Sequence, residues 1–287
     1  MKLRFALLFG GVILAVLQLA GAQSMTLPGT IQAGSALDIQ TTGSGSGVLY
    51  IVGPSQVLHQ NVTLGQTASF DSGTLTNAGV YTVILTGGSS TEHRTLNVVP
   101  AKQAAHITFL ARPSRLAVNL RNGISGAVYV FDAYYNLITQ PMTVSFDLTP
   151  PSGAAQHRKA TTVNGAAWIQ LDATPKEGMG NFVATADGVT SKRIVEQVPG
   201  DPCRLRMSAQ RPGKQLELQT DPVRDCSGNA VPDGTIVTFT EDYKGTQSTV
   251  DVPLKRGIAK VEMPAHSGAT ITVASGVVLG NEIHWTE

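Results

Sequence analysis

Short runs of alternating apolar and polar residues constrain the fold of this chain more than any other feature. The runs are rich in Val, Thr, Ile and Phe, and Gly, Pro, Asn and Asp separate them. The clearest are VLYIV (48–52), YTVIL (81–85), AVYVF (127–131), MTVSF (142–146), TIVTF (235–239) and ATITVA (269–274). A period of two between turn residues is typical of β-strands. The sequence therefore predicts an all-β fold, with almost no helix after residue 24.

An internal repeat divides the chain further. Several blocks recur in the same order, which indicates that 101–200 and 201–287 are two copies of one fold. The matching pairs are Val99-Pro100 with Val198-Pro199, Asp132 with Asp225, Asn136 with Asn229, Phe146 with Phe239, and Gly165 with Gly257. Residues 23–100 form a third module, whose Tyr81 resembles the tyrosine corner of immunoglobulin-like sandwiches. We therefore expect tandem immunoglobulin-like β-sandwiches over 23–100, 101–200 and 201–287.

The N-terminus has the pattern of a secretory signal peptide. Lys2 and Arg4 provide a positive start, residues 5–19 are nearly all apolar, and Ala20-Gly21-Ala22 offers small residues for cleavage. The apolar run is short for a membrane span. We predict a signal peptide over 1–22 and an exported chain that is not membrane-spanning after cleavage. The expected location is secreted, periplasmic or at the cell surface.

The two cysteines fit an exported protein. Cys203 and Cys226 are the whole complement, and each would otherwise be a free thiol in an oxidising compartment. Cys203 is expected at the start of the first strand of its module and Cys226 in the turn after the second strand. A hairpin turning near Pro212-Gly213 brings these ends together, so we predict a disulfide between them.

The most specific motif is DCSGNAVPDGTIVTF (225–239), which predicts two turns followed by a strand. The motif, with Gly257-Ile258-Ala259 after it, resembles the bacterial immunoglobulin-like domains of the invasin/intimin type. The resemblance is best over 203–276 and partial over 105–188, where Tyr135 replaces the glycine before the asparagine. It implies tandem sandwiches on exported bacterial surface proteins, which usually act as spacers or adhesion platforms. Its motif residues build turns, so it implies no active site.

Three aromatic residues are the candidates for binding. Trp168 lies out of phase with Ala167 and Leu171, so it is expected on the outward face of its strand, where it either anchors a ligand or packs against a neighbouring module or loop. Tyr134 and Tyr135 occupy a turn that is rich in glycine in the other copy, where they either bind or cap the core. We predict a binding role for all three.

Other functional classes find little support. The net charge of +1 argues against a nucleic-acid partner. No nucleophile elbow or catalytic constellation is recognisable, and the scattered histidines predict no metal site and no cofactor. Asp132, Asp225, Asp233, Glu241 and Asp242 are interpreted as surface turn carboxylates rather than calcium ligands. The sequence thus favours a non-enzymatic envelope protein that presents its modules to a protein partner. A soluble module for a glycan or cell-wall polymer is the alternative.

Overall fold

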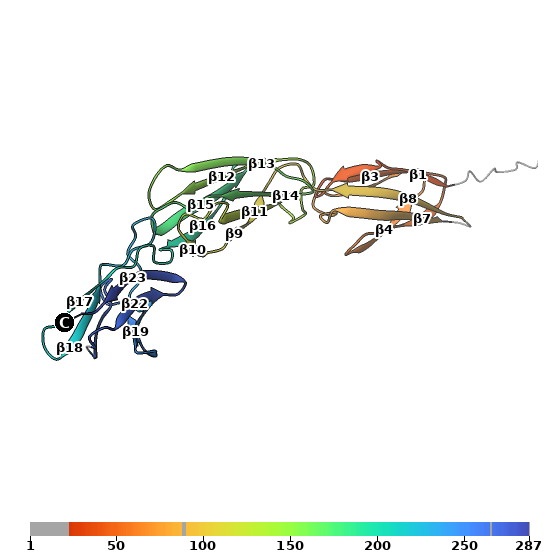
Figure 1. Cartoon of the computed structure of the whole chain (residues 1–287). Helices are drawn as coiled ribbons and strands as arrows, with labels where there is room; N and C mark the ends of the chain where they lie inside the picture. The colour runs from red at the N-terminus through yellow and green to blue at the C-terminus, as the bar shows by residue number, and fades with distance from the viewer. Residues whose placement is uncertain (1–22, 88–89, 265, 287) are drawn as a thin grey trace, which may run out of the picture. The chain divides into compact units, whose positions relative to one another are not determined.

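A computed structural model describes residues 23–87, 90–264 and 266–286. The described part of the chain is built of twenty-three β-strands and contains no helix, as expected for an all-β fold (Figure 1). None of the described residues forms a helix long and apolar enough to cross a membrane. The predicted signal peptide, residues 1–22, lies outside the described residues. The chain divides into two compact units between Ala101 and Lys102.

The first unit is one β-sandwich of two sheets. A three-stranded sheet has the order β1-β3-β6, and a five-stranded sheet has the order β2-β8-β7-β4-β5. Alternate residues of β3 and β7 are buried between the sheets, around Ile39, Tyr81 and Leu85. The strands are β1 (Ser24–Thr26), β2 (Thr30–Gln32), β3 (Leu37–Thr42), β4 (Ser46–Val52), β5 (Val57–Thr63), β6 (Thr67–Phe70), β7 (Gly79–Gly87) and β8 (Ser90–Val99).

Tyr81 makes the contact expected of a tyrosine corner. Its hydroxyl donates a hydrogen bond to the backbone carbonyl of Asn77 at 2.8 Å, and its side chain is fully buried. Burial raises the pKa of the phenol. Gly53 leaves space for the ring, because a Cβ at that position would lie closer than 3.0 Å to three ring atoms. This pair links the turn after β4 to the start of β7.

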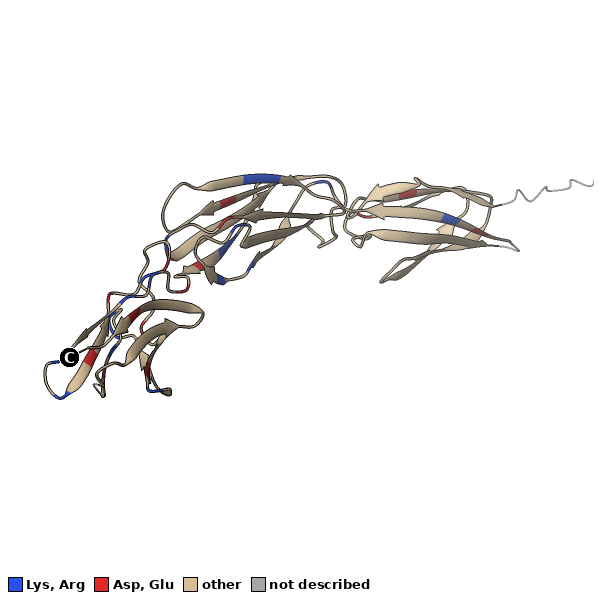
Figure 2. Ribbon diagram, in the orientation of Figure 1, with Lys and Arg blue, Asp and Glu red and all other residues tan. Residues whose placement is uncertain are grey.

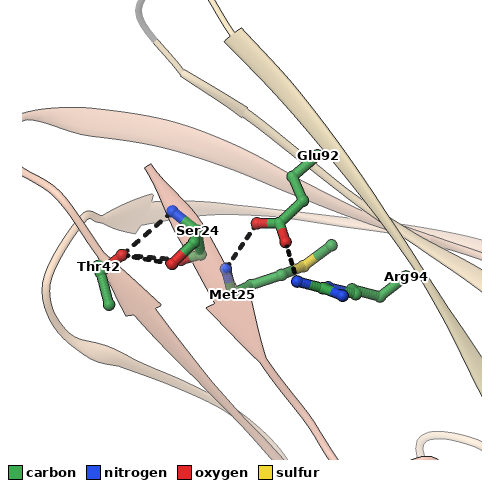
Figure 3. A network of polar contacts seen from close by, with 5 residues as sticks. All are labelled: Ser24, Met25, Thr42, Glu92 and Arg94. Atoms are coloured by element: carbon green, nitrogen blue, oxygen red, sulfur yellow. Dashed lines mark hydrogen bonds and ion pairs between the residues drawn. The ribbon is translucent and has the colours of Figure 1, made fainter. Parts of the chain in front are cut away.

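The first described strand is held at its edge by a carboxylate. Oε2 of Glu92, on β8, accepts a hydrogen bond from the Met25 amide at 2.7 Å, and Oε1 pairs with Arg94 at 2.6 Å (Figure 3). On the other side of β1, the hydroxyls of Ser24 and Thr42 lie 2.7 Å apart. The start of the predicted mature chain is therefore part of the sandwich.

The second unit begins with a sandwich of eight strands. One sheet has the order β10-β16-β15-β12-β13 and the other β14-β11-β9. Phe109, Phe146 and Phe182 meet between the sheets, with ring centroids 5.0 to 6.3 Å apart. The strands are β9 (His106–Arg112), β10 (Arg115–Ala117), β11 (Ile124–Phe131), β12 (Thr143–Thr149), β13 (Gln156–Thr161), β14 (Ala166–Leu171), β15 (Gly178–Ala186) and β16 (Val189–Val198).

A second sandwich with its own core completes this unit. Its sheets have the orders β17-β18-β21 and β20-β19-β22-β23, and Leu218, Val237 and Phe239 are fully buried between them. The strands are β17 (Met207–Gln210), β18 (Gln215–Thr220), β19 (Ile236–Tyr243), β20 (Thr246–Pro253), β21 (Lys260–Pro264), β22 (Thr270–Ser275) and β23 (Val278–His284).

The predicted disulfide joins Cys203 and Cys226. The hairpin of β17 and β18 turns between Gln210 and Gln215, near the expected position. Cys203 lies ahead of β17 rather than at its first residue, because β17 begins at Met207. The backbone pairing nevertheless extends beyond the strands, to a bridge between Pro202 and Asp225. This extension brings the cysteines together.

The two sandwiches of the second unit contain the same turn. The amides of Tyr134 and Asn136 donate to Oδ1 of Asp132, each at 2.9 Å. The amides of Ser227 and Asn229 donate to Oδ1 of Asp225 at 2.9 and 2.8 Å. An aspartate whose carboxylate accepts hydrogen bonds from the backbone amides of its own turn stabilises that turn locally, and no neighbouring strand is needed.

The prediction that the five carboxylates are surface residues is wrong for three of them. Asp132, Asp225 and Glu241 are buried. Asp225 is buried because its own turn satisfies its carboxylate, and Glu241 pairs with the His266 ring nitrogen at 2.9 Å. Within the described ranges, no group of three or more His, Cys, Asp or Glu is arranged to hold a metal ion.

Candidate functional site

The outward face of the β14-β11-β9 sheet carries a row of apolar side chains. Ala127 on β11 pairs with Trp168 on β14 and with Leu110 on β9, so the three side chains lie side by side on one face. Trp168 is 69 % exposed and Leu110 is 43 % exposed. Trp168 therefore faces outward, as the alternation of the sequence predicted.

A second row lies next to the first on the same face. Tyr129, two residues along β11, pairs with Ala166 on β14 and Thr108 on β9, and it is 41 % exposed. Residues two apart in a strand share a face. The two rows together form one surface, which we call the aromatic face and define as Leu110, Ala127, Tyr129, Ala166 and Trp168. Its two alanines are half-buried and its three larger side chains are exposed.

The predicted tyrosine turn adjoins this face at one end. Phe131, the last residue of β11, pairs with His106. The His106 ring stacks on Tyr135, with centroids 4.1 Å apart and planes 4° from parallel. The structure thus brings the tyrosine turn and the strand that carries Trp168 to one side of the sandwich, although the two lie far apart in the sequence.

Tyr135 has an unusual backbone conformation. Its φ of 63° is left-handed, and Gly228 occupies the same position of the other turn with φ 82°. A non-glycine residue in this region costs about 1 kcal/mol or more. Stacking on His106 offsets part of that cost. Both Tyr134 and Tyr135 are exposed, so neither caps the core.

One border of the aromatic face is polar. Ser125, two residues before Ala127 on β11, pairs with Arg112 on β9 and Gln170 on β14. Arg112 and Gln170 are exposed. The face therefore has an apolar centre with a polar margin at this end, and a polar rim around an apolar centre is the arrangement found in protein–protein interfaces.

Sequence reasoning found Trp168 but missed Leu110 and Tyr129. The sequence signal for Tyr129 was the alternation of the run AVYVF (127–131), in which Tyr129 lies between Val128 and Val130, both of which are buried. That phase indicates an outward tyrosine, but it does not show which strands lie beside it.

This sheet has two edge strands, β14 and β9. β14 is the terminal strand of the β14-β11-β9 order, so it pairs with β11 on one side only. Edge strands with free backbone groups accept further strands.

Comparison with known proteins identifies the class of fold. No protein-family model matches the chain, and no curated protein matches it. A solved structure of Yersinia pseudotuberculosis InvD is 15 % identical, covers 91 % of this chain and 96 % of its own, and has a TM-score of 0.50. The chain is thus a tandem immunoglobulin-like β-sandwich protein, and the resemblance to the invasin/intimin type is confirmed at the level of the fold.

Two further solved structures are more distant. Invasin, a bacterial integrin-binding protein, is 13 % identical over 90 % of this chain and 58 % of its own, with a TM-score of 0.46. The FN1-FN3 domains of chicken CNTN1 are 10 % identical over 92 % of this chain and 98 % of theirs, with a TM-score of 0.38.

Proposed function

We propose that this chain is a non-enzymatic interaction protein of the cell envelope or surface, which binds a protein partner through the aromatic face. Its modules are residues 23–100, 101–200 and 201–287, and the middle module carries the binding surface. The observation that supports the proposal is the row of Leu110, Ala127 and Trp168 on one face of a sheet, in which Leu110 and Trp168 are exposed.

The composition of the face favours a protein over a small ligand. Exposed Trp, Tyr and Leu side chains surrounded by polar residues form the centre of protein interfaces, and Trp and Tyr supply most of the binding energy there. Small-molecule sites are usually concave, whereas this surface is one side of a three-stranded sheet. The open edge of β14 gives a partner strand a place to pair beside Trp168.

Export is part of the proposal. The signal-peptide pattern of residues 1–22 and the disulfide between Cys203 and Cys226 both favour an oxidising compartment outside the cytoplasm. Secretion of a chain that begins near Gln23 is the expected result, and N-terminal sequencing of the exported protein measures it. Recovery of the full-length chain in the cytoplasm alone would contradict export.

Replacement of Trp168 tests the binding surface. Residues 23–287 are immobilised, and the partner retained from the host envelope is identified and its affinity measured. Trp168→Ala should weaken that affinity by about thirtyfold or more, the loss typical of a central interface Trp. Lys159→Ala, at an exposed position of the opposite sheet, is the matched control and should leave the affinity unchanged. Equal affinities for both variants would refute the assignment of the surface.

A glycan or cell-wall polymer is the second candidate ligand. The aromatic rings of Trp168, Tyr129 and Tyr135 lie on one side of the sandwich, and aromatic rings provide platforms for sugars. In this case purified polymer would be retained by the wild-type chain and not by Trp168→Ala. Retention of polymer by both would count against the aromatic face as a sugar site.

A further inference from the structure

A separate pocket lies beside the disulfide, in the second sandwich of the second unit. Residues 203–206, ahead of β17, and residues 221–228, after β18, form it. These segments extend the β17–β18 hairpin, since the Asp221 amide donates to the Arg206 carbonyl at 2.9 Å. The disulfide joins their far ends, so the pocket has a covalently fixed wall. Its volume is about 520 Å³, within the usual range for small-ligand sites.

Three arginines line this pocket: Arg204, Arg206 and Arg224. Arg204 and Arg206 flank the buried Leu205, so both side chains point away from the core. Arg224 comes from the opposite segment and is also exposed. Charged residues make up 14 % of the chain and most of the ribbon in Figure 2 is uncharged, so three arginines among the nine residues of one pocket are a local concentration of guanidinium groups.

The three arginines are not held in ion pairs by any described residue. Within the residues that the structure describes, no ion pair joins any of the three to a carboxylate. The Asp225 carboxylate instead accepts hydrogen bonds from the amides of its own turn and from the Gly200 amide at 3.0 Å. Arg224 donates one N–H group to the Gly228 carbonyl at 2.9 Å, which leaves four for other acceptors. Asp221 is the one remaining carboxylate at the pocket.

We propose that this pocket binds a tetrahedral oxyanion, a phosphate or sulfate ester carried by a larger molecule. A guanidinium group presents paired N–H donors whose spacing matches the oxygens of such an anion. Two arginines on one segment and a third on the next can surround the anion from two sides. The volume leaves room for the sugar or alcohol to which the ester is attached. This site is independent of the aromatic face, which belongs to the preceding sandwich.

Titration of the whole chain with small anions tests the proposal. Residues 23–287 are titrated with inorganic phosphate, pyrophosphate and sulfate at constant ionic strength, and backbone amide shifts are recorded. Saturable shifts are expected at residues 203–206 and 221–228. The double variant Arg204→Gln/Arg206→Gln should weaken binding by about tenfold or more, because each replacement removes charge-assisted hydrogen bonds. Arg121→Gln, at an exposed arginine of the other sandwich, should bind as the wild type does.

The competing outcomes are distinct. Tighter binding of inorganic phosphate than of sulfate supports a phosphate ester, and the reverse order supports a sulfate ester. Shifts that sodium chloride reproduces, or that the double variant retains in full, overturn the proposal. Equal weakening by Arg121→Gln also overturns it, since the effect would then come from net charge alone. All the changed residues are exposed, so near-ultraviolet circular dichroism should show the wild-type fold in each variant.

Discussion

Replacement of Gly53 by alanine should displace the Tyr81 ring and disrupt its hydrogen bond. The added Cβ would lie closer than 3.0 Å to three atoms of a ring that is fully buried and cannot move freely. Overpacking of this kind costs about 1–3 kcal/mol. Tyr81→Phe alone should cost about 1 kcal/mol, because it removes the hydrogen bond to the Asn77 carbonyl. In the Gly53→Ala background that bond is already broken, so Tyr81→Phe should then cost little.

The two changes should therefore be non-additive by about 1 kcal/mol. Hydrogen exchange of the β7 amides in residues 23–287, followed by mass spectrometry, measures the free energy of opening of this sandwich within the whole chain. Gly29→Ala is the matched control, because a Cβ there has no neighbour within 4 Å. It should change the free energy by less than about 0.5 kcal/mol. Additive effects of Gly53→Ala and Tyr81→Phe would refute the steric reasoning.

Three further predictions concern the second unit. Thiol titration of the unreduced chain should find no free thiol at Cys203 or Cys226, and two free thiols would contradict the disulfide. Burial raises the pKa of Asp225, but hydrogen bonds lower it by more. Asp225 therefore stabilises the fold fully above its ordinary pKa of 3.8, and this stability is lost as pH falls through the lowered value. Acid unfolding of Asp225→Asn should lack that loss. Gly126→Ala should destabilise by about 1–3 kcal/mol in urea, since its Cβ would lie 2.7 Å from Phe182.

The fold was largely predictable because strand alternation records burial directly. In β19, Val237 and Phe239 are buried and Ile236 is exposed, as the sequence pattern indicates. The same reasoning placed Trp168 outward, from its phase against Ala167 and Leu171. Local pattern thus determines which face a side chain occupies.

The composition of the site was less predictable, because it depends on which strands are neighbours. Leu110 and Trp168 share a face only because both pair with β11, and no local pattern states that pairing. The burial of Asp225 was missed for a different reason. Aspartate is usually a surface residue, but here four hydrogen bonds from nearby donors compensate its charge. An aspartate four residues before an asparagine in a tight turn is the signal that could have revealed it.

Site-specific photo-cross-linking in the host envelope tests the central claim most directly. A photoreactive amino acid is placed in the exported chain at Leu110 or Tyr129, on the aromatic face, and at Lys159, on the opposite sheet. One discrete protease-sensitive adduct is expected from the first two positions and none from Lys159. The absence of any protein adduct at Leu110 and Tyr129, or the same adduct at all three positions, would contradict that claim.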